Sequence, residues 1–578
     1  MTKRQIYLNE YNMPTGNTFY LPYSSGLLQA YAQQLDIIND NYIFKPILFR
    51  RDIVNNLVKK YHNPDIVGFS LSVWNYNLSL AVAKQIKKRF PHSYIMCGGP
   101  SAPLNSIEFF KNHPYIDLII YKEGERLFRE VLIQQLNSKI LPQHTTIFKV
   151  DPIKDLDIFP SPYVNNIYKE LIQDNSDIQF KAIVETNRGC PFKCSYCFWG
   201  VSVGQKKIGF HSSEYIRKDA EWISKQKIEY VFCADANFGM FRQDIQTAQT
   251  YKKIKQKCKY PKKFRVCYGK NTTDNIFQTA SILSNANLAK NVSLSVQTTT
   301  NEVLQNVGRK NIKSSVFKKL LQQYIDANIP TYTEVILGLP GETYHSYLNS
   351  LQQIIESVKH NHIFIYHCIV LPNTTLNEKR YRQEYGIKTV NVPLAEVHGT
   401  IRDKRLEQEF EEIIIGTNTM PTEDWVQCAV ISWVVQVFHS FKIGYDIVDY
   451  LAKTYDIKHI DFYKFLIYDT NLQIIYNFIN KAYDITNGNS RCCSIPIYGN
   501  IYYDPEEITF LDIIRTKTDF YQRLHNIIQD FLQTKGLKKD SYIRILCNKQ
   551  MDKLPNIENF SSLEEFATQT ILYGRKSS

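Results

Sequence analysis

The chain has few of the features that mark membrane, secreted or disordered proteins. No window of its 578 residues approaches the apolar length of a membrane-spanning helix. The segment Met1–Glu10 lacks the apolar core of a signal peptide. Hydrophobic residues still make up 44% of the chain and aromatic residues 13%, which is ample for packed cores and excludes a disordered scaffold. The length predicts about two to four domains.

Cysteines are too few and too scattered for a disulfide framework. The chain has 12 of them, and no second Cys-x2-Cys unit is present to complete a zinc site. Nine are expected mostly to be core residues: Cys97, Cys233, Cys258, Cys267, Cys368, Cys428, Cys492, Cys493 and Cys547.

Acidic residues are fewer than basic ones, 56 against 69, which gives a net charge of +13. The excess is diffuse, with short runs such as 84–89 and 252–263 on expected helices. This distribution favours solvated helix faces over a nucleic-acid surface and remains compatible with an anionic or peptide substrate.

Three cysteines stand apart from the rest, because Cys190, Cys194 and Cys197 follow one another at Cys-x3-Cys-x2-Cys spacing. Residues 181–186 are expected to form a short strand, and the glycine and proline that flank Cys190 turn it into a loop. Three thiolates at this spacing can hold three irons of a 4Fe–4S cluster and leave the fourth iron open to a ligand. We expect such a cluster to do chemistry and to require a reducing cytoplasm.

With Tyr196 directly before the last cysteine, the motif resembles the signature of the radical S-adenosylmethionine (SAM) enzymes. The resemblance implies that the amino and carboxylate groups of SAM chelate the open iron and that Tyr196 contributes to the cofactor site. It also implies that an electron, from a flavodoxin- or ferredoxin-type donor, cleaves SAM to methionine and a 5′-deoxyadenosyl radical.

Residues 1–138 alternate short apolar runs with helical patterns, which predicts a parallel, doubly wound sheet of flavodoxin-like type. The expected strands are 6–10, 42–49, 66–71, 94–97 and 118–121, and the expected helices are 24–34, 53–61, 78–90, 107–112 and one from 126. Ligands of such sheets bind at the carboxyl ends of the strands.

The expected strand ends carry polar residues and glycines, which supply hydrogen bonds and close backbone approach. They are Ser70, Ser72, Asn75, Gly98, Gly99 and Glu123. Ordinary tight turns would explain any one of these ends. Together with Pro22-x2-Ser25-Gly26, they resemble the cobalamin-binding domain of one radical SAM subgroup. The Asp-x-His-x-x-Gly loop of other cobalamin proteins is absent, so the resemblance implies a cobalt without a histidine below it.

Residues 139–180 read as a polar, proline-containing linker, and 181–375 return to strand–helix alternation. Six strands are expected at 182–186, 229–234, 264–268, 292–297, 332–337 and 363–370, which fits the partial (β/α)6 barrel of the radical SAM family. Residues 376–578 are expected to form a mainly helical region that covers the barrel and sets substrate choice, with helices in 430–438, 462–479 and 508–531.

The barrel strands end in motifs that the resemblance assigns to SAM. Asp235 and Asn237 are expected at its amino group, Gln297 at its ribose and Arg309 at its carboxylate. A helix cap is the alternative for Asp235 or Asn237 alone. Leu339 lies in the fifth-strand motif Glu334–Thr343, where glycine backbone is expected to pack near adenine, and Glu342 is expected as a cap or a polar contact. Lys270 and Asn271 are expected to face substrate or a cofactor phosphate.

The pattern as a whole predicts a cobalamin-dependent radical SAM methyltransferase acting on an unactivated carbon. By resemblance, one SAM methylates cobalt and a second supplies the radical that abstracts hydrogen. Peptide or natural-product substrates are expected, because the Asp235–Gly239 and Gln297 variants resemble members that modify peptides. Two alternatives remain open: a radical SAM cyclase, epimerase or rearrangement enzyme without methyl transfer, and a non-enzymatic cobalamin or nucleic-acid binding module.

Overall fold

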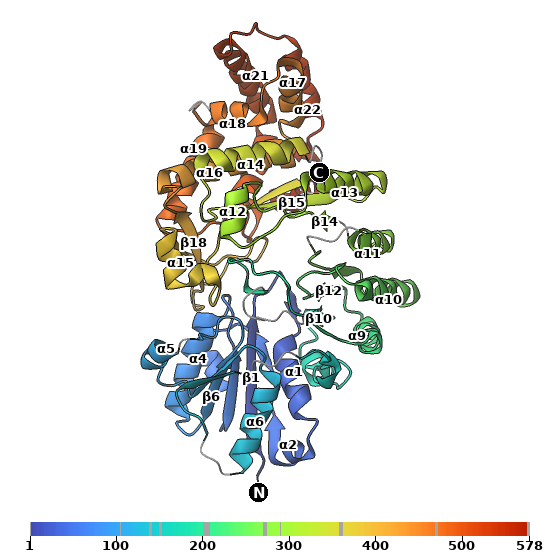
Figure 1. Cartoon of the computed structure of the whole chain (residues 1–578), viewed down its shortest axis with the longest axis vertical. Helices are drawn as coiled ribbons and strands as arrows, with labels where there is room; N and C mark the ends of the chain where they lie inside the picture. The colour runs from blue at the N-terminus through green and yellow to red at the C-terminus, as the bar shows by residue number, and fades with distance from the viewer. Residues whose placement is uncertain are drawn as a thin grey trace. The chain divides into compact units, whose positions relative to one another are not determined.

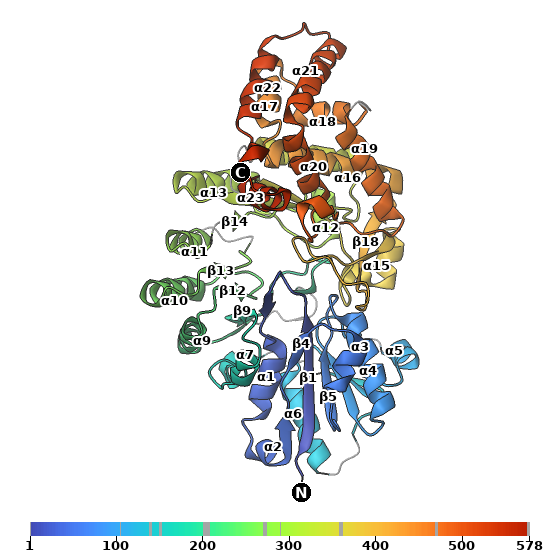
Figure 2. The same ribbon diagram turned by 180° about the vertical axis from the view of Figure 1, so that it is seen from behind.

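The computed structural model describes residues 2–104, 106–137, 141–148, 153–199, 208–269, 274–289, 291–357, 362–468 and 472–574. The chain divides into two compact units (Figures 1 and 2). Unit 1 contains Met1–Lys290, Val370–Tyr381 and Arg402–Glu411, and unit 2 contains Asn291–Ile369, Arg382–Ile401 and Glu412–Ser578. Two short segments from the second half of the sequence thus belong to the amino-terminal unit.

The amino-terminal sheet of unit 1 is parallel and doubly wound, as the sequence predicts. Its strand order is β3-β1-β5-β6-β7-β8, with β4 also pairing with β1. The strands are β1 (Arg4–Asn12), β3 (Tyr42–Phe44), β4 (Leu48–Arg50), β5 (Ile66–Ser70), β6 (Tyr94–Gly98), β7 (Leu118–Tyr121) and β8 (Thr145–Phe148). Without the edge strand β8, this is the flavodoxin-like order, whose ligand crevice lies where the order reverses, between β1 and β5.

Helices cover both faces of this sheet because each presents an apolar stripe to it. Helix α1 (Tyr23–Ala32) packs beside α6 (Glu125–Leu136), and α3 (Val54–Lys59) packs beside α4 (Tyr76–Arg89). Helix α5 (Ile107–Asn112) lies on the side of α4, as Figure 1 shows. The short helix α2 (Asp36–Asn41) and the strand β8 were not predicted.

The second sheet of unit 1 holds the first half of the predicted barrel. Its parallel order is β13-β12-β9-β2, with β9 (Gln179–Val184), β12 (Tyr230–Cys233), β13 (Lys263–Arg265) and β2 (Thr18–Tyr20). Helices α9 (Ser213–Lys225), α10 (Arg242–Cys258) and α11 (Asp274–Asn285) follow one another beside it. The edge strand β2 comes from the loop after β1, so the two sheets of unit 1 are joined through the backbone.

Unit 2 contains the other predicted barrel strands in a separate parallel sheet, β14-β15-β16. They are β14 (Val292–Ser293), β15 (Thr331–Leu337) and β16 (His362–His367), with helices α12 (Asn301–Asn306), α13 (Ser314–Asp326) and α14 (Tyr344–Ser357). Strand β14 is shorter than predicted and ends at Ser293, and further along Gln297 adopts a left-handed backbone with φ of 67°. Backbone hydrogen bonds to β15 continue past the strand end, since the Leu294 and Gln297 amides donate to the Tyr332 and Glu334 carbonyls.

The carboxyl-terminal part of unit 2 is helical, as expected. Its helices are α16 (Thr422–Val435), α17 (Tyr445–Tyr455), α18 (His459–Tyr468), α19 (Gln473–Thr486), α20 (Pro505–Arg515), α21 (Lys517–Thr534), α22 (Tyr542–Asp552) and α23 (Leu563–Gly574). The stretches predicted as helices at 462–479 and 508–531 are each two helices. At the second break, Thr516 has non-helical torsions and lies between α20 and α21.

Within the described ranges, no single helix combines the length and apolar character that a membrane span requires. The helices at Thr422–Ser440 and Tyr445–Tyr455 meet the length and apolarity requirements only when taken together, and this pair is bent by 94°.

Candidate active site

The three cysteines lie in the loop that follows β10 (Asn187–Arg188), a short strand paired antiparallel with β11 (Gly209–Phe210). Gly189 turns the chain with a φ of 126°, which side chains rarely tolerate. Cys194 is buried, whereas Cys190 and Cys197 are half-buried. Among the described residues, no three Cys, His, Asp or Glu side chains converge on one point as ligands of a single ion. The order Cys-x3-Cys-x2-Cys remains the basis for expecting a cluster, in which each thiolate binds a different iron.

Asp235 fixes the backbone from which the cysteine loop begins. Its carboxylate accepts hydrogen bonds from the Thr186 and Asn187 backbone amides at 2.8 and 3.2 Å, and from both of their side chains. Burial raises the pKa of Asp235 to about 6, although these donors oppose the shift. The carboxylate is therefore already engaged within the protein, and its predicted contact with the amino group of SAM stays a prediction.

Asn237 contacts the cysteine loop directly, since its side-chain amide donates to the Cys190 sulfur at 3.2 Å. The side chain is buried. In an iron–sulfur site, a hydrogen-bond donor on a ligating sulfur helps set the reduction potential of the cluster.

Arg188 connects the cysteine loop with the β7–α6 loop of the amino-terminal sheet. Its guanidinium makes ion pairs with Glu185 at 2.8 Å, Glu125 at 3.0 Å and Glu123 at 3.5 Å. It also lies over the Phe159 ring, 5.4 Å from the centroid. Burial raises the pKa of Glu123, whereas the nearby Arg188 lowers it. Glu123, predicted at cobalamin, therefore ties the sheet edge to the predicted cluster site.

The loops at the carboxyl ends of β5 and β6 hold one another in place. The Asn75 side chain accepts from the Ser72 amide at 2.8 Å and donates to the Tyr11 and Ser70 carbonyls, both at 3.0 Å. Gly99 has a φ of 94°, and a Cβ on it would lie 2.7 Å from the Leu71 carbonyl oxygen. Asn75 and Ser72 are thus buried parts of the loop, while Ser70, Gly98 and Gly99 remain half-buried at the edge.

The segment Val370–Tyr381 joins both predicted cofactor loops. The Asn373 side chain donates to the Pro100 and Ala102 carbonyls of the β6 loop at 3.0 and 2.8 Å. A few residues on, the Leu376 amide donates to the Ser195 carbonyl of the cysteine loop at 2.9 Å. These bonds bring the predicted cluster and cobalamin loops together within unit 1.

Tyr196 is half-buried in the cysteine loop of unit 1. Three further residues predicted at SAM belong to unit 2: Gln297 follows β14, Arg309 follows α12 and Leu339 follows β15. Arg309 is buried, donates to the Ser295 carbonyl at 2.7 Å and to the Asn311 side chain at 2.8 Å. Gln297 is buried, and its side-chain oxygen accepts no hydrogen bond in the described part of the chain. Leu339 is fully buried.

Glu342 is a buried polar contact and links two loops of unit 2. It accepts from Thr298 at 2.8 Å, from Thr300 at 2.9 Å and from Ser346, and burial raises its pKa. Lys270 and Asn271 lie outside the described residues.

The sequence did not single out Arg188, Glu409 or the role of Asn373 in holding the β6 loop. Arg188 stands two residues before the first cysteine, so its position in the motif was a usable signal. No local pattern marks the partners of the other two.

The residues present fit the groups that the motifs imply. An amide donor lies on a cysteine sulfur, and a buried acceptor at Gln297 has no hydrogen-bond partner in the described ranges, as a hydroxyl-bearing ligand requires. The half-buried glycines and Ser70 lie beside the crevice expected for the ligand of this sheet.

Comparisons with known proteins agree with this arrangement. Residues 184–354 match the model of the radical SAM superfamily. The chain is 32% identical over 487 residues to 2-(S-pantetheinyl)-carbapenam-3-carboxylate methyltransferase of Streptantibioticus cattleyicolor, a match that covers 80% of this chain and 71% of that protein. It is also 32% identical to the cobalamin-dependent radical SAM methyltransferase TokK of Streptomyces tokunonensis, over 80% of this chain and 69% of that protein.

The fold is similar to that of the radical SAM methyltransferase TsrM from Kitasatospora setae, solved with cobalamin and a 4Fe–4S cluster bound. The TM-score is 0.53 at 12% identity, over 76% of this chain and 90% of that chain. The two relatives show that the chain belongs to the radical SAM superfamily, among its cobalamin-dependent methyltransferases.

Proposed function

We propose that this enzyme methylates an unactivated carbon of a small, carboxylate-bearing natural product. The observation that carries the proposal is the linkage of the cysteine loop to the loops of the amino-terminal sheet, through Arg188 and the segment Val370–Tyr381. A radical source and a methyl carrier must act on one substrate in turn, so their binding loops have to be held in a fixed relation.

The cofactors supply the difficult chemistry when bound: the cluster and SAM provide hydrogen abstraction, and cobalamin provides the methyl group. The protein's residues bind and orient them. In our proposal Cys190, Cys194 and Cys197 hold the cluster, and Asn237 tunes it through the Cys190 sulfur.

The further predicted contacts divide between the other two cofactors. Gln297 and Arg309 are proposed for SAM, together with Tyr196, Asp235 and Leu339. Ser70, Gly98 and Gly99 are proposed to receive cobalamin directly, while Ser72, Asn75 and Glu123 shape its loops.

The relatives and the charge of the chain support this substrate class. One relative is named for a carbapenam carboxylate with a pantetheinyl group. The net charge of +13 is compatible with an anionic substrate of this kind.

Two further assignments complete the proposal. A flavodoxin- or ferredoxin-type protein would deliver the electron. A site built from three thiolates also favours a reducing cytoplasm as the location of the enzyme.

The test is anaerobic reconstitution with iron, sulfide and hydroxocobalamin, followed by reaction with SAM carrying a labelled methyl group. Candidate substrates are a carbapenam carboxylate and, for comparison, a peptide. We expect label in the small-molecule product and formation of 5′-deoxyadenosine, both lost in Cys194→Ala. A product without label would favour cyclisation, epimerisation or rearrangement instead, and preferential labelling of the peptide would contradict the substrate class.

A further inference from the structure

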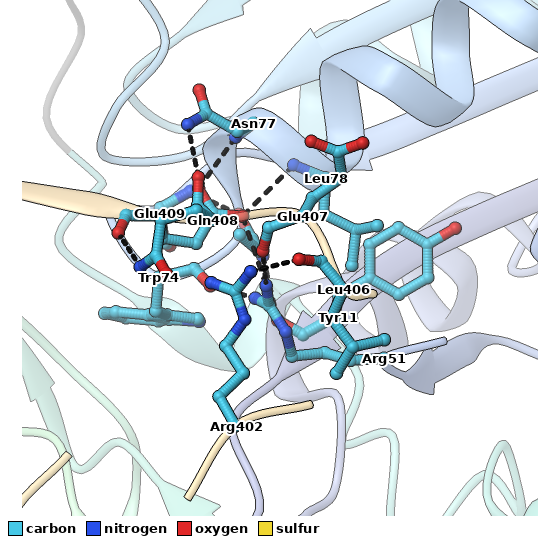
Figure 3. Close-up of polar contacts among 12 residues, drawn as sticks. Tyr11, Arg51, Trp74, Asn77, Leu78, Arg402, Leu406, Glu407, Gln408 and Glu409 are labelled. Carbon is cyan, nitrogen blue, oxygen red and sulfur yellow. Dashed lines mark hydrogen bonds and ion pairs between the residues drawn. The ribbon is translucent and has the colours of Figure 1, made fainter. Parts of the chain in front are cut away.

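The segment Arg402–Glu411 belongs to unit 1, although the residues that flank it in sequence belong to unit 2. We call it the strap. Figure 3 shows the strap against Arg51, Trp74, Asn77 and Leu78 of the amino-terminal domain. These residues surround the end of the β5–α4 loop, which carries Ser70, Ser72 and Asn75.

Glu409 is the buried contact of the strap. Its side chain is 2% exposed, and that of its ion-pair partner Arg51, 3.3 Å away, is 4% exposed. The same carboxylate accepts from the Asn77 and Leu78 backbone amides at 2.8 and 3.1 Å. Burial lowers the pKa of Arg51, while the negative charge of Glu409 opposes this shift.

Further bonds fix the register of the strap on the loop. The Asn77 side chain donates to the Gln408 carbonyl at 2.6 Å. Arg51 donates to the Glu407 carbonyl at 3.2 Å and to the Trp74 carbonyl. Both ends of the ion pair are therefore attached to the loop as well as to each other.

Glu409 takes over a task that a local residue normally performs. The first amides of a helix need an acceptor, and asparagine in the position before the helix is among the best. Asn75 occupies that position for α4 but makes no capping bond. Its side chain instead holds Ser72, Ser70 and Tyr11. The carboxylate of Glu409, near the positive end of the α4 dipole, caps the helix in its place.

We propose that Glu409 is a positioning residue for cobalamin binding, because by capping α4 from the strap it frees Asn75 to hold the β5–α4 loop in its binding shape. This inference rests on the proposed function of that loop. Without the Glu409 carboxylate, Asn75 turns toward the α4 amides, and the bonds to Ser72, Ser70 and Tyr11 are lost. The loop then no longer presents a fixed surface to the cofactor.

The experiment compares full-length wild type with Glu409→Gln and Glu407→Gln. The control is matched, since Glu407 is the same residue type two positions away with an exposed side chain. Retention of hydroxocobalamin is measured by absorbance after equilibrium dialysis. We expect affinity to fall about tenfold in Glu409→Gln, equivalent to about 1.4 kcal/mol, and to stay unchanged in Glu407→Gln. SAM cleavage to 5′-deoxyadenosine should stay within about twofold of wild type in both, because the cysteine loop is untouched.

Two further measurements separate positioning from general stability. In the cofactor-free protein, hydrogen exchange of a peptide spanning residues 70–80 should accelerate in Glu409→Gln, while exchange of β9 stays unchanged. A double-mutant cycle with Asn75→Ala should be strongly non-additive for cobalamin affinity, since both changes remove the same loop bonds.

Additive effects, unchanged loop exchange, or a parallel loss of cluster, SAM cleavage and cobalamin would each overturn the inference. Failure of wild type to bind cobalamin would instead contradict the proposed function, and the exchange measurement would still decide whether Glu409 fixes the loop.

Discussion

Replacement of Arg188 by methionine should destabilise unit 1 far more than replacement of a comparable surface arginine. Three carboxylates surround Arg188, and the side chains of all four residues are 8–18% exposed. Methionine keeps most of the alkyl packing but removes the only positive charge in this group of four. Removing one partner of a buried ion pair typically costs about 3–5 kcal/mol, because the remaining charge stays desolvated.

The natural control is Arg217→Met on α9. Arg217 also pairs with two carboxylates, Glu214 at 2.7 Å and Glu221 at 2.6 Å, but its side chain is 45% exposed. Exposed pairs contribute about 0–1 kcal/mol, so this variant should be close to wild type. With a slope of about 2 °C or more per kcal/mol for a large domain, Arg188→Met should lower the first unfolding midpoint by about 6 °C or more.

The pH dependence provides a second, independent readout. Without Arg188, the pKa of the Glu123 carboxyl group rises further, because burial raises it and the positive charge of Arg188 no longer opposes that shift. A carboxyl pKa that is higher in the folded than in the unfolded state costs stability as pH increases through that interval. The penalty of Arg188→Met should therefore be larger at pH 8 than at pH 5.5. Thermal unfolding of the reduced full-length chain, followed by circular dichroism at both pH values, tests this. Equal shifts in the two arginine variants, or a penalty independent of pH, would refute the reasoning.

Three further predictions concern other positions in unit 1. Asp219 is buried and its pKa is raised to about 7. Asp219→Asn should therefore stabilise the protein at pH 8 by up to about 4 kcal/mol in urea unfolding, and this gain should vanish toward pH 4. A loss of stability at pH 8 would contradict a buried charge at this position. Gly99→Ala should destabilise the protein and weaken cobalamin retention, because the new Cβ would lie 2.7 Å from the Leu71 carbonyl oxygen. The control is Gly16→Ala, where φ is 57° and no atom lies within 4 Å of the new Cβ, so the free energy of unfolding should fall by only about 1–2 kcal/mol. Asn237→Ala should make the reduction potential of the cluster more negative in an EPR-monitored redox titration, since a hydrogen-bond donor to the Cys190 sulfur is lost. An unchanged potential would mean that this hydrogen bond is absent in the enzyme with its cluster bound.

Much of the architecture could be predicted because it depends on local pattern. The alternation of apolar runs and helical stretches predicted β1, β5, β6 and β7, whereas the run predicted as one strand at 42–49 forms the two strands β3 and β4. Runs such as β1 and β5 need no distant information. The prediction failed where a tertiary constraint acts on short segments. Strand β14 ends at Ser293, ahead of the left-handed backbone at Gln297, and Thr516 separates two helices within one apolar stretch. Neither residue type marks such a break on its own.

The sequence by itself determined the chemistry of this protein, because ligand spacing is a covalent property. Cys190, Cys194 and Cys197 lie within eight residues of the chain, and their identity and order predict a cluster with an open iron in any fold that exposes them. Tertiary structure decided which side chains support that chemistry. Asn77 and Glu409 are 332 residues apart in the chain, and Arg188 on β10 is 63 residues from Glu125 at the start of α6. Such contacts depend on how separate elements pack in space, and no local propensity records them.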